Sequence, residues 1–232
     1  MRQMEFRFSV GHGGARKGAG RRRRGDRDRV GHRKREEFSG TRVVHITCRI
    51  REGLPSLREV GTVAMLFNYL LRNCEREGFR IVEFSVQGNH VHMLCEADSK
   101  EALSRAMNGI LCGMARRLNR QWKRRGRVFA DRYHAEGITT PTQCRHALIY
   151  VLANVFKHGG RAEGTKVDTF STAAWFPFDG GRCEHPLGKR RKPAAGARTW
   201  LLRDGWRMSG RITMRDHPCK TRPGRRKRHA ML

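Results

Sequence analysis

The chain has 232 residues and a formal net charge of +29, with 38% hydrophobic and 31% charged residues. This composition leaves room for one modest core, and such a charge is best balanced by a polyphosphate, so we expect a nucleic-acid partner. No apolar run is long enough to cross a membrane, and the first residues lack the apolar centre of a signal peptide. These features argue against membrane and secreted classes, and we expect a cytoplasmic protein.

The positive charge is concentrated at the two ends of the chain. Residues 1–42 contain 14 Lys or Arg against 5 Asp or Glu, and residues 180–232 contain 16 against 3. The stretch "GGARKGAGRRRRGDRDRVGHRKREE" has almost nothing to bury, so residues 1–41 are predicted to form a disordered basic tail. We expect one folded domain over residues 42–160 and a basic, partly disordered extension over 161–232. The seven cysteines are scattered singly, which favours free thiols in a reducing compartment.

The first half of the domain reads as one strand, one helix and a hairpin. The β-branched run 42–50 predicts a strand. Ser56 and Glu59 have the spacing of a capping box and predict a helix that Gly78 would close. Residues 79–87 and 90–97 then predict two strands joined by the pair Gly88-Asn89.

The second half begins with a capping box at Asp98 and Glu101, which predicts a long helix to about Gly126. A strand over 127–138 follows. Thr140, with proline next and glutamine at the third position, predicts another helix that runs to residues 159–160. The order of elements predicts an α+β, ferredoxin-like (split βαβ) antiparallel sheet with an extra C-terminal helix.

Two sets of polar residues are candidates for a catalytic site. His90 and His92 lie two apart on a strand, so both imidazoles point to the same face. His146, Tyr150 and Asn154, followed by His158, are spaced by four and predict one stripe on the last helix. If that stripe crosses the sheet, the histidine pair and a tyrosine hydroxyl meet.

A divalent metal held by two imidazoles and one side-chain oxygen would suit phosphoryl transfer. It would polarise a scissile phosphate and neutralise developing charge. Tyrosine is a weak nucleophile with a reference pKa of about 10, so it needs this help. Imidazole ligands favour softer transition ions, whereas nuclease chemistry usually uses Mg²⁺ or Mn²⁺, which we expect here.

The long basic helix is a candidate DNA contact. The segment from Lys100 to Arg127 contains nine basic residues and one acid, too lopsided for internal ion pairs. Trp122 is available to stack on a base. The predicted DNA-binding residues are Arg105, Arg116, Arg117, Arg120, Trp122, Lys123 and Arg124.

Four stretches together resemble the single-tyrosine HUH transposases (IS200-like), and most closely the REP-associated tyrosine transposases of bacteria: "NHVHML", the basic helix, "GRVFADRYHAE" and "YVLANVFKHG". The resemblance implies a metal-dependent nuclease and strand transferase for single-stranded DNA flanked by hairpins. It also implies a monomer or homodimer associated with the bacterial nucleoid. By motif position, His90 and His92 would be metal ligands, Tyr150 the nucleophile and Asn154 a polar third ligand. Many relatives have proline after this asparagine, whereas this chain has Val155.

Plainer alternatives stand beside each assignment. The histidines could be ordinary strand residues, and Tyr150 could be a core residue. Tyr133 is the competing nucleophile. A non-catalytic module could instead bind single-stranded DNA or RNA on the same fold, although the hairpin strands offer only Phe79 and Phe84 for stacking. Trp200 and Trp206 in the extension either join the core or meet a base.

Overall fold

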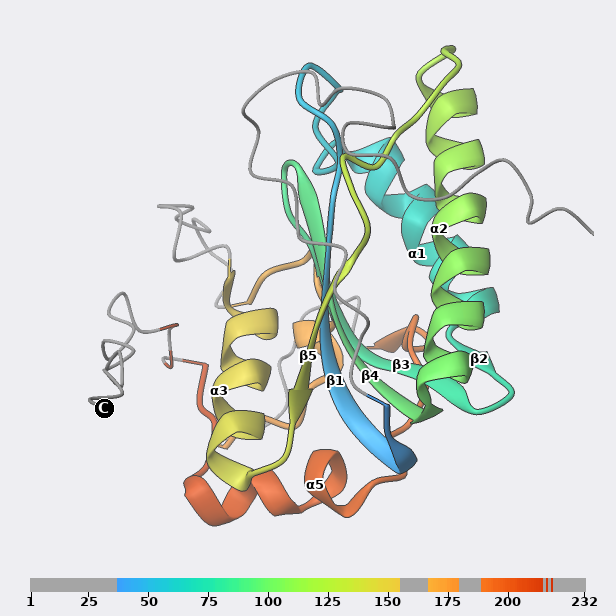
Figure 1. The fold of residues 1–232 in the computed structure, drawn as a ribbon. Coiled ribbons are helices and arrows are strands. Elements are labelled where there is room, and N and C mark those ends of the chain that lie inside the picture. The colour runs from blue at the N-terminus through green and yellow to red at the C-terminus, as the bar shows by residue number, and fades with distance from the viewer. Residues whose placement is uncertain (1–36, 155–166, 180–188, 215, 217, 219–232) are drawn as a thin grey trace, which may run out of the picture. The chain divides into compact units, whose positions relative to one another are not determined.

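The computed structural model describes residues 37–154, 167–179, 189–214, 216 and 218 (Figure 1). Most of the tail predicted to be disordered lies outside these residues, as does His158. Within the described part, no helix is long and apolar enough to cross a membrane.

Five antiparallel strands form one sheet in the order β2-β3-β4-β1-β5. The strands are β1 (Ser39–Arg49), β2 (Glu75–Arg76), β3 (Phe79–Val86), β4 (His90–Ser99) and β5 (His134–Ile138). The helices α1 (Val60–Asn73) and α2 (Lys100–Gln121) connect them in the split βαβ pattern, and α3 (Pro141–Leu152) follows β5. This arrangement confirms the predicted ferredoxin-like fold with an extra helix.

One face of the sheet is covered by α1 and α2 (Figure 1). Alternate strand residues such as Ile46, Phe84 and Met93 point into this core and are fully buried. The two helices approach closely at Gly113, where an added Cβ would lie 2.0 Å from the Tyr69 hydroxyl oxygen. The Tyr69 hydroxyl donates to the carbonyl of Ile110 at 3.2 Å, so this tyrosine is part of the helix packing.

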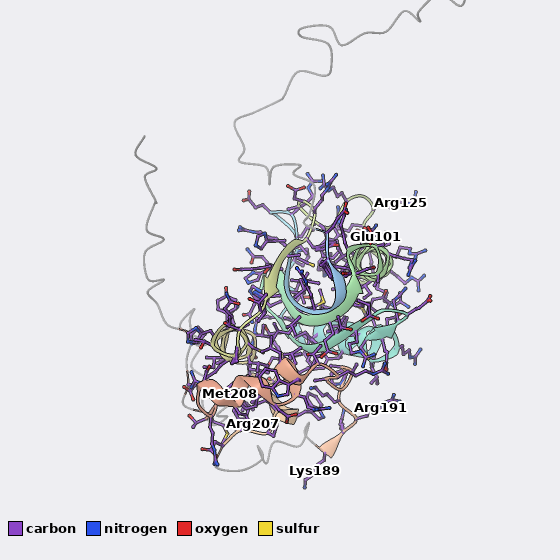
Figure 2. The ribbon with its side chains drawn as sticks, turned by 60° about the horizontal axis from the view of Figure 1, so that its bottom comes forward. Glu101, Arg125, Lys189, Arg191, Arg207 and Met208 are labelled. Carbon is purple, nitrogen blue, oxygen red and sulfur yellow. The ribbon has the colours of Figure 1, made fainter. Side chains whose placement is uncertain are left out.

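The opposite face, which we call the tyrosine face, is covered by α3 and by the C-terminal elements η1 (Thr172–Trp175), α5 (Trp200–Arg203) and η3 (Gly205–Ser209). Its core contains Val43, Val82, Leu94 and Ile138 from the four longer strands. Figure 2 shows α2 and α3 nearly end-on, on opposite sides of the strands. Of the two tryptophans, Trp206 joins this core, whereas Trp200 is 52% exposed.

Three predicted boundaries differ from the structure. Helix α1 begins at Val60, because the Ser56 hydroxyl accepts from the Arg58 amide instead of capping the helix. It ends at Asn73, and Gly78 with φ +64° instead serves the turn between β2 and β3. Ser99, not Asp98, caps α2 by accepting from the Ala102 amide at 3.1 Å.

Two further differences concern the second half of the domain. Helix α2 ends at Gln121, short of Gly126, and β5 contains only residues 134–138 of the predicted strand.

The capping box at Thr140 and Gln143 is confirmed, with both of its hydrogen bonds formed. β1 begins at Ser39, before the predicted domain border at residue 42.

Two buried carboxylates attach the C-terminal segments to the sheet. Glu96 on β4, 1% exposed, accepts hydrogen bonds from the backbone amides of Arg198 and Thr199 at the start of α5. Asp168 is 2% exposed and forms a two-point ion pair with Arg58, at 2.8 and 3.1 Å. The same guanidinium donates to the Val86 carbonyl and lies over the Phe170 ring.

We predict that Arg58→Ala lowers the free energy of unfolding by about 3 kcal/mol, because it leaves the Asp168 carboxylate buried without its counterion. Urea unfolding followed by circular dichroism measures the change. Arg72→Ala is the matched control, since Arg72 is exposed on α1 and its removal should cost less than about 0.5 kcal/mol. Equal losses in the two variants would contradict a structural role for the ion pair.

Candidate active site

The tyrosine face is apolar at one end and polar at the other. Along β1 its residues run from Val43 through His45 and Thr47 to Arg49. On β4 the cross-strand partners of Thr47 and Arg49 are His92 and His90. The polar end therefore lies beside the β3–β4 hairpin, and the apolar end lies under the first turns of α3.

Three histidine rings and the Tyr150 ring form one cluster at the polar end. The ring centroids of His90 and His92 are 4.6 Å apart, and those of His92 and His45 are 5.2 Å apart. Tyr150, on the last turn of α3, lies edge-on to His92 at 4.9 Å and to His45 at 5.7 Å. The sequence prediction that the histidine pair shares a face and meets the tyrosine helix is borne out by this geometry.

The protein holds the Nδ1 atoms of the histidine pair. His90 Nδ1 lies 2.7 Å from the Asn89 side-chain oxygen, which can only accept, so Nδ1 carries the proton. His92 Nδ1 lies 3.0 Å from the Thr47 hydroxyl and 3.2 Å from His45 Nε2. When Nδ1 is the protonated nitrogen, Nε2 carries the lone pair, which is the tautomer that a metal ligand requires.

His45 is kept neutral at this site. Burial lowers its pKa to about 4, with the nearby Glu136 opposing this shift and His134 adding to it. A neutral imidazole can hydrogen-bond to His92 without adding positive charge to the cluster. We infer that His45 helps to orient the His92 ring through this hydrogen bond.

The histidine pair supplies only part of the ligand set that a divalent metal ion needs. No group of three or more His, Cys, Asp or Glu side chains capable of holding a metal occurs in the described part of the chain. The two imidazoles therefore need an amide, water or phosphate oxygen to complete a site. Asn154 is fully buried, and neither its amide nitrogen nor its oxygen has a hydrogen-bond partner among the described residues. An unsatisfied buried amide is costly, so its oxygen is a reasonable candidate for a third ligand.

The predicted stripe on the last helix is wrong. Helix α3 ends at Leu152 with Ala153 as its C-cap, so the spacing of four does not continue to Asn154. His146 is on the exposed side of α3. His146 and Tyr150 are the two stripe residues on α3, and of these two Tyr150 contacts the histidines.

The other two tyrosines lie in the core on the opposite face of the sheet. Tyr69 is buried between α1 and α2, and Tyr133 is 6% exposed in the same apolar cluster. The competing nucleophile Tyr133 is therefore separated from the histidine cluster by the sheet. Of the three tyrosines of the chain, Tyr150 is the one that lies on the same face of the sheet as the histidine cluster.

The predicted DNA-binding residues lie on α2 and just after it, on the face of the sheet away from Tyr150. Five of them are exposed: Arg105, Arg116, Arg117, Arg120 and Lys123. Arg117 is stacked over the Tyr69 ring at 4.2 Å, and Arg124 donates to the Asn119 side chain. Trp122 is half-buried against the core and caps α2. DNA that contacts both α2 and Tyr150 must therefore pass around an edge of the sheet or the hairpin end.

Sequence reasoning missed three residues of β1. These residues are His45, Thr47 and Arg49, none of which the sequence placed beside the histidine pair. Arg49 is exposed on the tyrosine face directly opposite His90, where a guanidinium can contact a phosphate. The signal was present, since polar residues alternate with apolar ones over 45–49, but only the strand register assigns that side to the histidine pair.

Comparisons with known proteins found one family model and similar solved structures. The family model described as transposase IS200 like matches residues 44–151. A REP-associated tyrosine transposase bound to a REP hairpin has a similar structure (TM-score 0.48, 18% identity, 62% of this chain and 82% of that chain covered). So does a protein described as a transposase candidate from Deinococcus radiodurans (TM-score 0.38, 15% identity, 49% and 91% covered). No curated protein sequence matches the chain. The matched segment contains most of β1, the histidine pair, α2 and Tyr150, and residues 44–151 are therefore similar to the IS200-like transposase family.

Proposed function

We propose that this protein is an IS200-like transposase that nicks single-stranded DNA beside a hairpin and transfers the broken strand, with Tyr150 as the nucleophile and a divalent metal at the histidine pair. The match of residues 44–151 to the transposase model supports a role in DNA processing linked to transposition. The observation that carries the finer proposal is the contact between the Tyr150 ring and His92, at 4.9 Å between centroids.

The covalent step is a transesterification. Tyr150 gives its phenolic proton to solvent and its oxygen attacks the phosphorus. The bond from phosphorus to the 3′-oxygen breaks, and that oxygen takes up a proton from solvent. The products are a 5′-phosphotyrosine and a free 3′-hydroxyl, with no change of oxidation state. The phosphodiester energy is kept in the adduct, so a second 3′-hydroxyl can reverse the step and join a new strand.

His90 and His92 would hold Mg²⁺ or Mn²⁺ through Nε2, with Asn154 as the proposed third protein ligand. The metal would supply charge neutralisation at the scissile phosphate. The protein groups supply the geometry. Asn89 and Thr47 fix the orientation of the two imidazoles, and Arg49 offers a cation to the phosphate beside His90.

The alternative of a non-catalytic binding module gains no support from the aromatic residues of the hairpin. Such a module stacks bases on aromatic side chains of an open sheet face. Phe79 and Phe84 are 1% and 0% exposed, and both point into the core under α1 and α2. The tyrosine face is in turn covered by α3 and the C-terminal elements over its apolar half.

We expect a labelled hairpin-flanked oligonucleotide to become covalently attached to the protein in Mn²⁺ or Mg²⁺, and to run with it on a denaturing gel. Tyr150→Phe should abolish the adduct, His90→Ala should reduce it by at least about 100-fold, and chelation of the metal should remove it. The adduct should survive acid and hydroxylamine, which distinguishes a phosphotyrosine from an acyl phosphate.

Tyr133→Phe is the matched control, because it also removes one phenolic hydroxyl. Its adduct should form at the parental rate. Loss of the adduct in this variant but not in Tyr150→Phe would assign the nucleophile to Tyr133. Tight DNA binding without any adduct on several hairpin substrates would instead favour the binding module.

Removal of the groups that hold Nδ1 should weaken metal binding without removing a ligand. We expect Asn89→Ala and Thr47→Val each to raise the Kd for Mn²⁺ about tenfold, because the imidazoles lose their fixed tautomer and orientation. Electron paramagnetic resonance titration of free Mn²⁺, without DNA, measures this. Thr47→Ser retains the hydroxyl and should bind Mn²⁺ normally; failure of this variant would mean that the methyl packing matters rather than the hydrogen bond.

Asn154→Leu separates a ligand role from a structural role. The substitution removes an unsatisfied buried amide, so the metal-free protein should unfold at the same or a higher temperature. If the amide oxygen is a ligand, the rise in Tm that Mn²⁺ gives the parent protein should shrink in the variant. A full Mn²⁺ response in the variant would remove Asn154 from the metal site, whatever its effect on activity.

A further inference from the structure

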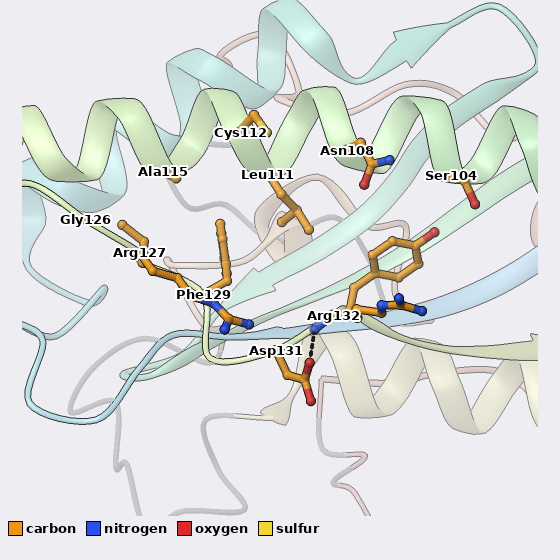
Figure 3. Close-up of a pocket in the computed structure, with 12 residues that line it drawn as sticks. Ser104, Asn108, Leu111, Cys112, Ala115, Gly126, Arg127, Phe129, Asp131 and Arg132 are labelled. Atoms are coloured by element: carbon orange, nitrogen blue, oxygen red, sulfur yellow. Dashed lines mark hydrogen bonds between the residues drawn. The ribbon is translucent and has the colours of Figure 1, made fainter. Parts of the chain in front are cut away.

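A cavity of about 600 Å³ lies between α2 and the segment that leads into β5 (Figure 3). The α2 side is lined by residues that include Ser104, Asn108 and Cys112, and the facing wall by Phe129, Asp131 and Arg132. In Figure 3 Ser104 and Asn108 project from α2 on the side of the cavity that faces Arg132. The cavity is on the α2 side of the sheet and is separate from the histidine cluster. Its volume falls in the range of small-molecule sites.

The lining carries the groups that recognise a nucleobase. Phe129 is half-buried, so part of its ring is available for stacking. Asn108 is exposed and offers both a donor and an acceptor to a base edge. Asp131 accepts from the Arg132 backbone amide through one oxygen, at 2.8 Å, and its carboxylate can accept from a base amino group as well. An aromatic surface with polar groups beside it suits an unpaired base better than an apolar ligand.

The rim of the cavity is cationic. Arg127 and Arg132 belong to the lining, and both are exposed. Arg105 precedes Asn108 by three residues and Arg116 follows Cys112 by four, so both project from the neighbouring surface of α2 and are exposed. Four guanidinium groups around one hollow, with a single carboxylate among the lining residues, match the phosphates on either side of an inserted base.

The cavity is linked to the histidine cluster through β5, an edge strand of the sheet. The lining ends at Tyr133, and the next residue, His134, is the cross-strand partner of Thr47. Thr47 in turn hydrogen-bonds to His92. His134 on β5 and His92 on β4 are thus separated, across the strands, by about two strand spacings, or ~10 Å. A single strand held at Tyr150 can reach the cavity by passing around the β5 edge.

We propose that this cavity binds one unpaired nucleotide of the DNA substrate, with its base against Phe129 and Asn108 and its flanking phosphates on the surrounding arginines. The proposal rests on the proposed function for its substrate class, single-stranded DNA next to a hairpin. It gives the exposed arginines Arg105 and Arg116 a specific role, and it sets the distance along the strand between a recognised base and the cleaved bond.

The alkylation rate of Cys112 can report whether this cavity is occupied. It lines the cavity and is exposed, whereas Cys48, Cys74, Cys95 and Cys144 are buried. Burial raises the pKa of the Cys144 thiol to about 12, so this residue should alkylate slowly whether or not DNA is present. Mass spectrometry of the cysteine peptides after a pulse of iodoacetamide follows Cys112 separately from every other cysteine, including Cys183 and Cys219.

The experiment uses full-length protein carrying Tyr150→Phe and a hairpin oligonucleotide with unpaired flanks on both sides, so that protection is read without cleavage. At a DNA concentration about ten times Kd, we expect the alkylation rate of Cys112 to fall about tenfold, because only unbound protein reacts. In a series of oligonucleotides that each lack one base, loss of the base at a single unpaired position should restore alkylation. Cys112 alkylation that is unchanged by saturating DNA would overturn the proposal.

Protection that no single abasic position relieves would also overturn it, since it would mean that DNA only lies across α2. Phe129→Leu should weaken binding of the intact oligonucleotide by about tenfold through lost stacking, and Phe129→Tyr should retain it. Arg120→Ala removes a cation of α2 that does not line the cavity, so it should weaken binding of every oligonucleotide by the same factor. In the parent protein, which retains Tyr150, formation of the covalent DNA adduct tests the proposed function independently of the cavity. An adduct without Cys112 protection rejects the cavity alone, and protection without an adduct rejects the nuclease alone.

Discussion

Burial of the apolar half of the tyrosine face is the constraint on which the site depends. Val43, Val82, Leu94 and Ile138 would face water if only α1 and α2 covered the sheet. At about 25 cal/mol per Å² of apolar surface, leaving four such side chains exposed would cost several kcal/mol. Helix α3 removes that cost with Leu148 and Leu152. Its start is fixed by the Thr140 capping box, so its last turn arrives where the apolar surface ends and the histidines begin.

The C-terminal segments have a structural part in the same arrangement. Trp206 and Leu202 enter the core that α3 shares with the sheet. The buried Glu96 carboxylate holds the start of α5, and the ion pair of Arg58 with Asp168 holds the segment before η1. A buried ion pair adds little net stability compared with apolar packing, but it is strongly directional. These contacts therefore specify where the extension lies, and its element η3 packs against α3.

The two faces of the sheet carry different groups, to which the proposed function gives different roles. The tyrosine face has a partly buried cluster of three imidazoles and one phenol, in which burial lowers the pKa of His45 to about 4. The α2 side has exposed arginines and a cavity with a stacking residue. The β5 edge lies between them. The exposed arginines of α2 lie away from the histidines, whereas Arg49 lies beside His90.

The sequence by itself determined the order of elements from β1 to α3 except β2, the shared face of His90 and His92, and the start of α3, because strand alternation, the Gly88-Asn89 turn and the Thr140 capping box are local features. It misplaced the start of α1, where the Ser56 hydroxyl accepts from the Arg58 amide instead of capping the helix, and that of α2, where the neighbouring Asp98 and Ser99 both suit the cap and Ser99 forms it. Only the tertiary structure decided that His45 and Thr47 support His92, that Tyr133 lies on the wrong face, and that α3 stops before Asn154. Each of these depends on strand register or on packing between segments far apart in the chain, and neither is encoded in local spacing.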